Sequence, residues 1–167
     1  MKIDKTPLAN PRLNLHKNPY YTGEYMTSLS DILDRQSSDI ERPKPLPAGS
    51  YICVVKGLPR FDKSSKKQTP FVEFTLQPLE ALDDVDKEAL EEMGGFNNKT
   101  IRATYYLTDD AAYRLKDFLD HCGIDEDGTL RQRIESTPGC QVVANLKHSP
   151  NMSGDGIRAE LASTSAV

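Results

Sequence analysis

The chain has 167 residues, of which 37% are hydrophobic and 28% are charged, and its formal net charge is −4. This length suits one domain with appendages, and the apolar fraction allows a packed core, so a chain disordered throughout is excluded. No stretch approaches the roughly 20 apolar residues of a membrane-spanning helix. The first residues lack the apolar segment of a secretory signal, and the three cysteines have no framework spacing. Both features predict a reduced, cytosolic protein without a membrane partner.

The net charge hides two neighbouring blocks of opposite sign. Residues 42–78 carry seven basic residues against two acidic ones, whereas residues 79–92 carry one lysine against seven acidic residues. A nucleic-acid-binding domain usually has a basic surface. The net charge of the whole chain argues against such a surface, whereas the basic block at residues 42–78 could form one. The charge pattern therefore keeps nucleic acid open as a partner.

The first 47 residues are predicted to form an arm that is separate from the main domain. The arm holds six of the eleven prolines, which disfavour regular helix or central strand. A capping-box pattern at Ser28–Asp31 predicts one short helix that ends near Gln36, and Pro43–Pro47 is typical of a semi-rigid linker. Such an arm is either a mobile tail or a contact to its own domain or to a neighbouring subunit. Three tyrosines that are costly to leave in water favour a contact: Tyr20, Tyr21 and Tyr25.

Residues 48–162 are predicted to form a mainly β domain, followed by a disordered tail over residues 163–167. Alternating or β-branched patterns predict strands, whereas the lysine-rich residues 58–69 are predicted to be a polar connection. The strands are predicted over residues 50–57, 71–77, 100–107, 140–147 and 157–162. Helices are predicted within an acidic insertion at about residues 79–95, from an N-cap at Thr108 to Gly123, and over residues 129–135.

This order of elements predicts an OB-fold-like β-barrel. Two strands, an insertion, a third strand, one amphipathic helix and a final hairpin match a five-stranded barrel whose single helix caps one end. The same order also fits an α+β sheet with one packed helix, and the residues alone leave that alternative open.

Sequence motifs for catalysis are absent, and the chain is predicted not to be an enzyme and to need no cofactor. It has no phosphate-binding glycine loop, nucleophile elbow or His-Glu-x-x-His motif. The acidic residues lie in one helical run, which disfavours a metal-dependent nuclease. Four residues are of the types that bind zinc: His121, Cys122, Cys140 and His148. Their spacing lacks the close pairs that zinc sites use, so no metal is predicted.

The basic connection is the strongest candidate for a binding site. In residues 56–69, four lysines and one arginine surround Phe61. Proteins that bind single strands without sequence preference combine cations for the phosphates with aromatic faces on which the bases stack. The alternative is a solvated lysine loop with Phe61 packed beneath it. The candidate nucleic-acid-binding residues are Lys56, Arg60, Phe61, Lys63, Lys66, Lys67, Phe71, Arg102 and Tyr106.

Several short motifs resemble those of small phage-encoded single-stranded DNA-binding proteins from replication and recombination loci. The resemblance covers residues 46–162, and its motifs are Leu46–Tyr51, Phe71–Phe74, Tyr105–Thr108, Leu115–Leu119 and Cys122–Ile124. It implies an OB-like fold and sequence-tolerant binding of single-stranded DNA in the host cytoplasm, with replication or recombination proteins as further partners. The positions that it implicates are Lys56, Arg60, Lys63, Lys66, Lys67, Phe71 and Tyr106. Bacterial-type single-strand binders often end in an acidic tip, whereas this chain has no acidic residue after Glu160, which puts partner recruitment by that route in doubt.

A second function remains open from the residues alone. A structural or assembly protein, such as a virion component, would use the proline- and tyrosine-rich arm to contact neighbouring subunits and form a homo-oligomer. The absence of a compact catalytic motif is compatible with this alternative as well.

Overall fold

The computed structural model describes residues 33–40 and 42–167, and its contacts divide the chain into one unit of residues 1–42 and another of residues 43–167. The described residues of the first unit include a 3-10 helix, η1 (Ser37–Asp39). The short helix predicted near residues 28–36 falls largely outside the described residues, as do the three tyrosines of the arm. Across the described ranges, no helix has the length and apolar character needed to cross a membrane.

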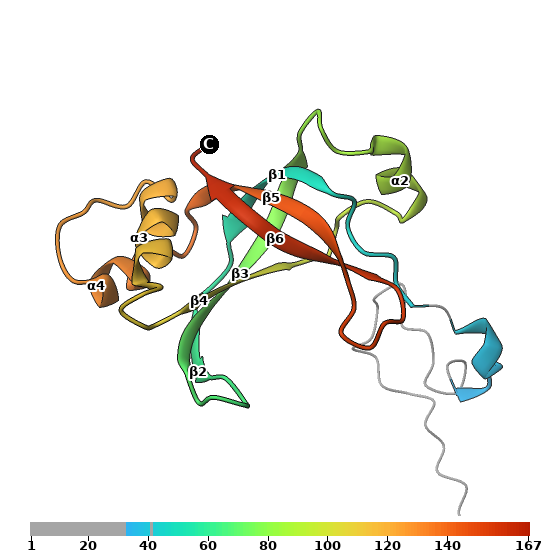
Figure 1. Cartoon of the computed structure of the whole chain (residues 1–167). Helices are drawn as coiled ribbons and strands as arrows, with labels where there is room; N and C mark the ends of the chain where they lie inside the picture. The colour runs from blue at the N-terminus through green and yellow to red at the C-terminus, as the bar shows by residue number, and fades with distance from the viewer. Residues whose placement is uncertain (1–32, 41) are drawn as a thin grey trace, which may run out of the picture. The chain divides into compact units, whose positions relative to one another are not determined.

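The second unit is mainly β, as the sequence predicted, and is built on one antiparallel sheet (Figure 1). Its elements in chain order are β1 (Gly49–Val55), β2 (Arg60–Lys63), β3 (Pro70–Ala81), α2 (Lys87–Glu92), β4 (Ile101–Tyr106), α3 (Ala112–His121), α4 (Leu130–Glu135), β5 (Gln141–Pro150) and β6 (Ile157–Ser165). The prediction missed β2, which lies in the segment that was expected to be a connection.

The sheet follows the order β2-β3-β1-β5-β6, and β4 pairs with β3. The long strand β3 pairs with β1 through residues 76–81, and with β2 and β4 through residues 70–76. Within the described residues, β4 and β6 form no ladder with each other. The predicted five-stranded barrel is therefore wrong in its strand number, and the sheet does not close into a barrel. The Tyr105 hydroxyl of β4 hydrogen-bonds to Thr164 of β6, and the His121 ring of α3 contacts the same Thr164 hydroxyl at 2.9 Å.

Strict alternation on β3 and β4 separates a buried face from an outer face. Val72, Phe74 and Leu76 are fully buried, whereas the residues between them are partly exposed. The apolar stripe of α3 covers this core as predicted, with ring centroids 4.7 Å apart for Phe74 and Phe118. Burying such side chains is the main source of stability in a domain of this size.

The two later helices begin differently from each other. The predicted side-chain cap at Thr108 is wrong, because α3 begins at Ala112 and the backbone carbonyl of Thr108 accepts the amides of Ala111 and Ala112. Residues 108–111, which were expected to start the helix, therefore form a turn before it. By contrast, α4 has a complete capping box between Thr129 and Gln132.

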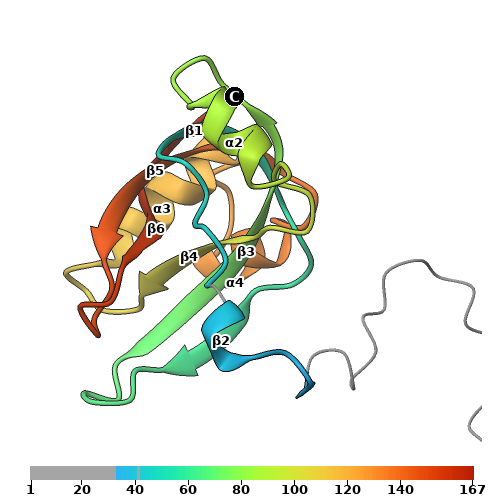
Figure 2. The ribbon, with the colours of Figure 1, turned by 90° about the vertical axis from the view of Figure 1, so that its right-hand side faces the viewer.

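The acidic insertion is fixed to the start of β1. Both carboxylate oxygens of Asp84 accept hydrogen bonds from Ser50, one from its amide at 3.1 Å and one from its hydroxyl at 2.6 Å. Figures 1 and 2 show α2 at one end of the sheet and the tip of the β2–β3 hairpin at the other. The acidic helix therefore lies away from the lysine-rich hairpin.

The C-terminal segment also differs from the prediction. β6 continues through Ser165, so residues 163–165 belong to the sheet and not to a disordered tail. Its register opposite β5 shifts between Asn145 and Leu146, and Asn145 donates a hydrogen bond to the Ser163 hydroxyl at 3.0 Å. This polar contact helps to hold a segment whose sequence has few apolar residues.

Candidate nucleic-acid interface

The outer face of β2, β3 and β4 brings most of the predicted binding residues together. Directly opposed residues of an antiparallel pair share one face, so the register groups the side chains in rows. One row is Asp62–Phe71–Tyr106, and the next is Arg60–Glu73–Thr104. The third row is Lys56–Thr75–Arg102, in which the Lys56 amide donates to the Thr75 carbonyl at 2.8 Å. We call these nine residues the outer face.

An aromatic pair, of which Tyr106 is exposed and Phe71 partly exposed, lies at one end of the outer face. The rings of Phe71 and Tyr106 meet edge to face, with centroids 6.2 Å apart and an interplanar angle of 73°. Tyr106 is 47% exposed, although a ring of this size is usually more deeply buried. The pair therefore offers an aromatic surface of the kind on which a base can stack.

Some charged residues of the outer face are paired with each other, and others are not. Arg60 forms an ion pair with Asp62 at 2.7 Å, and Thr104 contacts the Glu73 carboxylate at 3.5 Å. Among the described residues, neither Lys56 nor Arg102 has an ion-pair partner, and both are exposed. Their charges thus remain available to an anionic ligand.

The β2–β3 hairpin extends the outer face with a lysine-rich tip. Ser64 organises the turn, since its amide donates to the Thr69 carbonyl at 2.9 Å and its hydroxyl accepts the Thr69 amide at 3.0 Å. Gln68 takes the left-handed conformation, with φ of 53°, that closes the turn. Lys66 and Lys67 are exposed at this tip.

Two predicted residues fall on the other side of the hairpin. Phe61 pairs with Val72, whose side chain points into the core, and Lys63 pairs with Pro70. Phe61 therefore does not share a face with Phe71, although the sequence analysis grouped them. Neither is it packed beneath the hairpin, because 56% of it is exposed. The pairing register, which the missed strand β2 sets, decides this placement.

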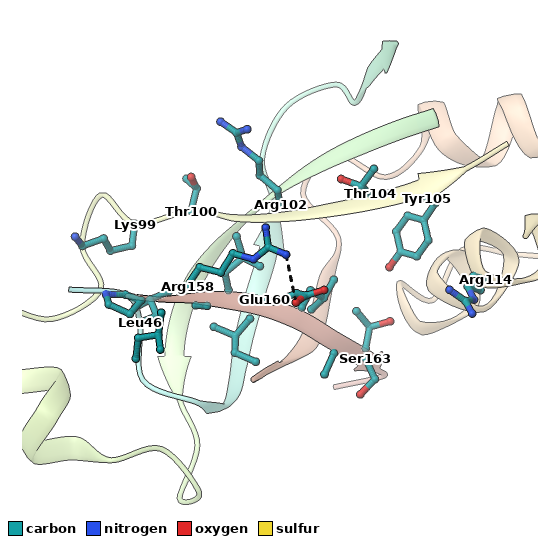
Figure 3. A pocket seen from close by; sticks show the side chains of 18 of the residues that line it. Leu46, Lys99, Thr100, Arg102, Thr104, Tyr105, Arg114, Arg158, Glu160 and Ser163 are labelled. Carbon is teal, nitrogen blue, oxygen red and sulfur yellow. Dashed lines mark ion pairs between the residues drawn. The ribbon is translucent and has the colours of Figure 1, made fainter. Parts of the chain in front are cut away.

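A groove beside the outer face contains Arg102 together with three cations that were not among the predicted binding residues. This β4–β6 groove has a volume of about 1120 Å³ and is lined by residues of β4, α3 and β6 (Figure 3). Its cationic side chains outnumber its carboxylates. The cations are Lys99, Arg102, Arg114 and Arg158, and the carboxylates are Asp117 and Glu160. Lys99, Arg114 and Arg158 come from separate segments of the chain, so no local charge pattern indicates that they share a groove with Arg102.

The residues considered for zinc or nucleophilic chemistry have other roles. Burial raises the pKa of the Cys53 and Cys122 thiols to about 12, so neither thiol provides a thiolate near neutral pH. His121 contacts Thr164 at 2.9 Å, and His148 contacts the Leu46 carbonyl at 2.9 Å. Within residues 33–40 and 42–167, no three His, Cys, Asp or Glu residues gather in a metal-binding geometry.

Comparisons with known proteins add little to this picture. No protein-family model and no curated protein matches the chain. Among solved structures, the chain is similar to yeast RPA bound to ssDNA, with 9% sequence identity and a TM-score of 0.31. The match covers 83% of this chain and 86% of that one. A TM-score this low does not establish a common fold.

Proposed function

We propose that this chain binds single-stranded DNA without sequence preference and without catalysis, through the outer face and the tip of the β2–β3 hairpin. The observation that carries the proposal is the solvent-facing Phe71–Tyr106 pair, which shares one face with Lys56 and Arg102, two cations that have no ion-pair partner among the described residues. Stacked bases need aromatic faces, and the phosphates between them need nearby cations, so this combination suits a single strand. A duplex buries its base faces and gains nothing from the aromatic pair.

The pairing of the strands supports an OB-like fold as part of the proposal. β1 pairs with β3 and β5, β3 pairs with β4, and β5 pairs with β6, while α3 lies between β4 and β5 in the chain. In this interpretation β2 is an extension of the loop that joins the first two barrel strands, and the β4–β6 boundary is the open side of the barrel.

The biological setting belongs to the proposal too. The short motifs between residues 46 and 162 resemble those of phage single-strand binders, so we place the activity in phage DNA replication or recombination, within the host cytoplasm. The alternative assembly function depends on the arm, most of which lies outside the described residues.

Fluorescence anisotropy tests the proposal with a labelled single-stranded oligonucleotide of mixed sequence and the full chain. We expect saturable binding whose affinity falls steeply with salt, with a log–log slope of about −0.7 for each phosphate neutralised. Unlabelled single strands of unrelated sequence should compete equally well, and a duplex of the same length should compete poorly. Equal competition by the duplex, or no anisotropy change at low salt, contradicts the proposal.

A further inference from the structure

Two strand edges face the β4–β6 groove without a backbone partner in the described part of the chain. Within residues 33–40 and 42–167, β4 pairs only with β3, and β6 pairs only with β5. Residues of both strands line the groove (Figure 3). Exposed strand edges present unpaired amides and carbonyls, and are therefore templates for another strand.

The ladders show which backbone groups point into the groove. The Leu107 amide donates to the Pro70 carbonyl at 2.8 Å, and bonding alternates along an antiparallel strand. The amides and carbonyls of Arg102 and Thr104 therefore point away from β3. On β6, the Asn151 amide donates to the Gly156 carbonyl at 2.9 Å, and the same alternation directs the backbone groups of Ile157 and Ala159 away from β5.

From these edges we infer that the β4–β6 groove binds an extended, acidic segment of a partner protein as an added β-strand, a role that goes beyond the proposed DNA binding. A polypeptide supplies amides and carbonyls that match both edges, whereas a sugar–phosphate backbone supplies acceptors only. Since β4 and β6 are each two antiparallel steps from β1, they run parallel to each other. An added strand that is antiparallel to one of them is therefore antiparallel to the other as well.

Charge and apolar surface define the chemistry of this partner. Alternate side chains of an added strand point to opposite faces, one toward the core and one toward solvent. The core side of the groove presents Tyr105, Leu146 and Leu161. On the solvent side Figure 3 shows Arg102 directed outward, and Arg158 lies 3.7 Å from Glu160. Because cations are in excess here, a strand that alternates apolar and acidic residues complements the groove.

A synthetic peptide tests this inference with the full chain. The probe is a labelled peptide of about twelve residues that alternates valine and glutamate, which is long enough to span either edge at about 3.3 Å per residue. We expect saturable binding by anisotropy, and a loss of about tenfold or more when alternate peptide amides are N-methylated, because methylation removes main-chain donors. An N-methylated peptide that binds equally well contradicts the inference, and so does a parent peptide that does not bind.

A pair of matched charge reversals separates this site from the DNA site. The double variant Lys99→Glu/Arg158→Glu should weaken peptide binding about tenfold. The control Lys66→Glu/Lys67→Glu reverses two exposed lysines at the hairpin tip, and should weaken DNA binding while leaving peptide binding unchanged. If the groove variant shows an altered thermal unfolding curve, Arg158→Gln replaces it. Equal loss of peptide binding in both variants would show attraction by overall charge and would overturn the inference.

Hydrogen exchange locates the peptide on the chain. Binding should slow exchange of the amides of Arg102, Thr104, Ile157 and Ala159 by about tenfold or more, since these gain partners. The amides of Ala103 and Arg158 already bond within the sheet and should change less. Peptide binding without this alternating protection contradicts an added strand. The same protection pattern induced by a single-stranded oligonucleotide would contradict it too. Failure of DNA binding in the same samples would refute only the proposed function.

Discussion

Phe71 and Tyr106 lie directly opposite each other on β3 and β4, and their rings meet edge to face at 6.2 Å on the solvent side of the sheet. The neighbouring pair, Val72 and Tyr105, points to the other side and packs with the core. The same two strands thus use one face for stability and leave the other available for a ligand.

Removing either ring of the exposed pair should weaken DNA binding with little effect on folding. We expect Tyr106→Ala to lower the affinity for single-stranded DNA by about 1–3 kcal/mol, which is roughly 5- to 150-fold, because a stacked base loses its platform. Anisotropy titration measures the loss, and thermal unfolding checks the fold. Tyr113→Ala is the matched control, since Tyr113 is 55% exposed on α3 and lies outside the outer face. Equal losses in both variants would place the base contacts elsewhere.

The hairpin lysines should contribute to affinity through charge alone. The triple variant Lys63→Ala/Lys66→Ala/Lys67→Ala should weaken binding to every sequence alike and reduce the log–log salt slope by about 0.7 for each lost phosphate contact. Titrations at several salt concentrations, with two unrelated oligonucleotides, measure both effects.

The matched control for these lysines is Lys44→Ala/Lys87→Ala. Both lysines form ion pairs with acidic residues of the insertion, Lys44 with Glu92 and Lys87 with Asp83. The control should leave the salt slope unchanged. A slope that falls equally in the two variants would mean that DNA responds to net charge and not to the hairpin.

The contact between Asp84 and Ser50 should make stability depend on pH. Hydrogen bonds from the Ser50 hydroxyl and amide lower the pKa of Asp84 below its usual value of 3.8. A carboxyl with a depressed folded-state pKa stabilises the fold above its unfolded pKa, and loses this contribution as the pH falls through the folded value. Asp84→Ala should therefore reduce the urea midpoint at pH 7 and reduce it less near pH 2. A difference between variant and parent that is constant with pH would contradict this linkage.

Gly49 should be intolerant of any side chain. Its φ is +136°, and a Cβ there would lie 2.7 Å from Val85 Cγ2 and 3.0 Å from the Asp84 carbonyl oxygen. Gly49→Ala should lower the free energy of unfolding by about 2–4 kcal/mol, through backbone strain and displacement of the insertion. Gly57→Ala is the control, because φ is +70° there but no atom lies within 4 Å of the added Cβ. Strain alone should cost about 1–2 kcal/mol, and urea denaturation compares the two variants.

The sequence predicted the parts of the fold that local patterns determine. Alternation of Val72, Phe74 and Leu76 identified the buried face of β3, and the stripe of Leu115, Phe118 and Leu119 identified the face of α3 that meets it. β2 has no such signal, since its four residues are all exposed and two of them are basic. It forms because β3 offers an edge and Ser64 and Gln68 form a turn, which are features of the pairing and not of the strand itself.

The candidate site was predictable in its residue types and less so in its arrangement. Phe71, Arg102 and Tyr106 share a face because their strands pair in register, as the alternation suggested. The separation of Phe61 from Phe71 depends on the register of β2, which a shift of one residue would reverse. The β4–β6 groove depends on contacts between distant segments, so nothing local in the sequence indicates it.

The length of β3 has a consequence for how related chains can differ in sequence length. Its twelve residues pair with three other strands, so one inserted or deleted residue in its middle would turn Val72 or Leu76 outward in several ladders together. The segment that follows, residues 82–100, is held to the sheet chiefly through Ser50, Gly49 and a few buried side chains. Natural variation in chain length should therefore concentrate in residues 86–99, while β3 keeps its number of residues and tolerates substitution on its solvent side.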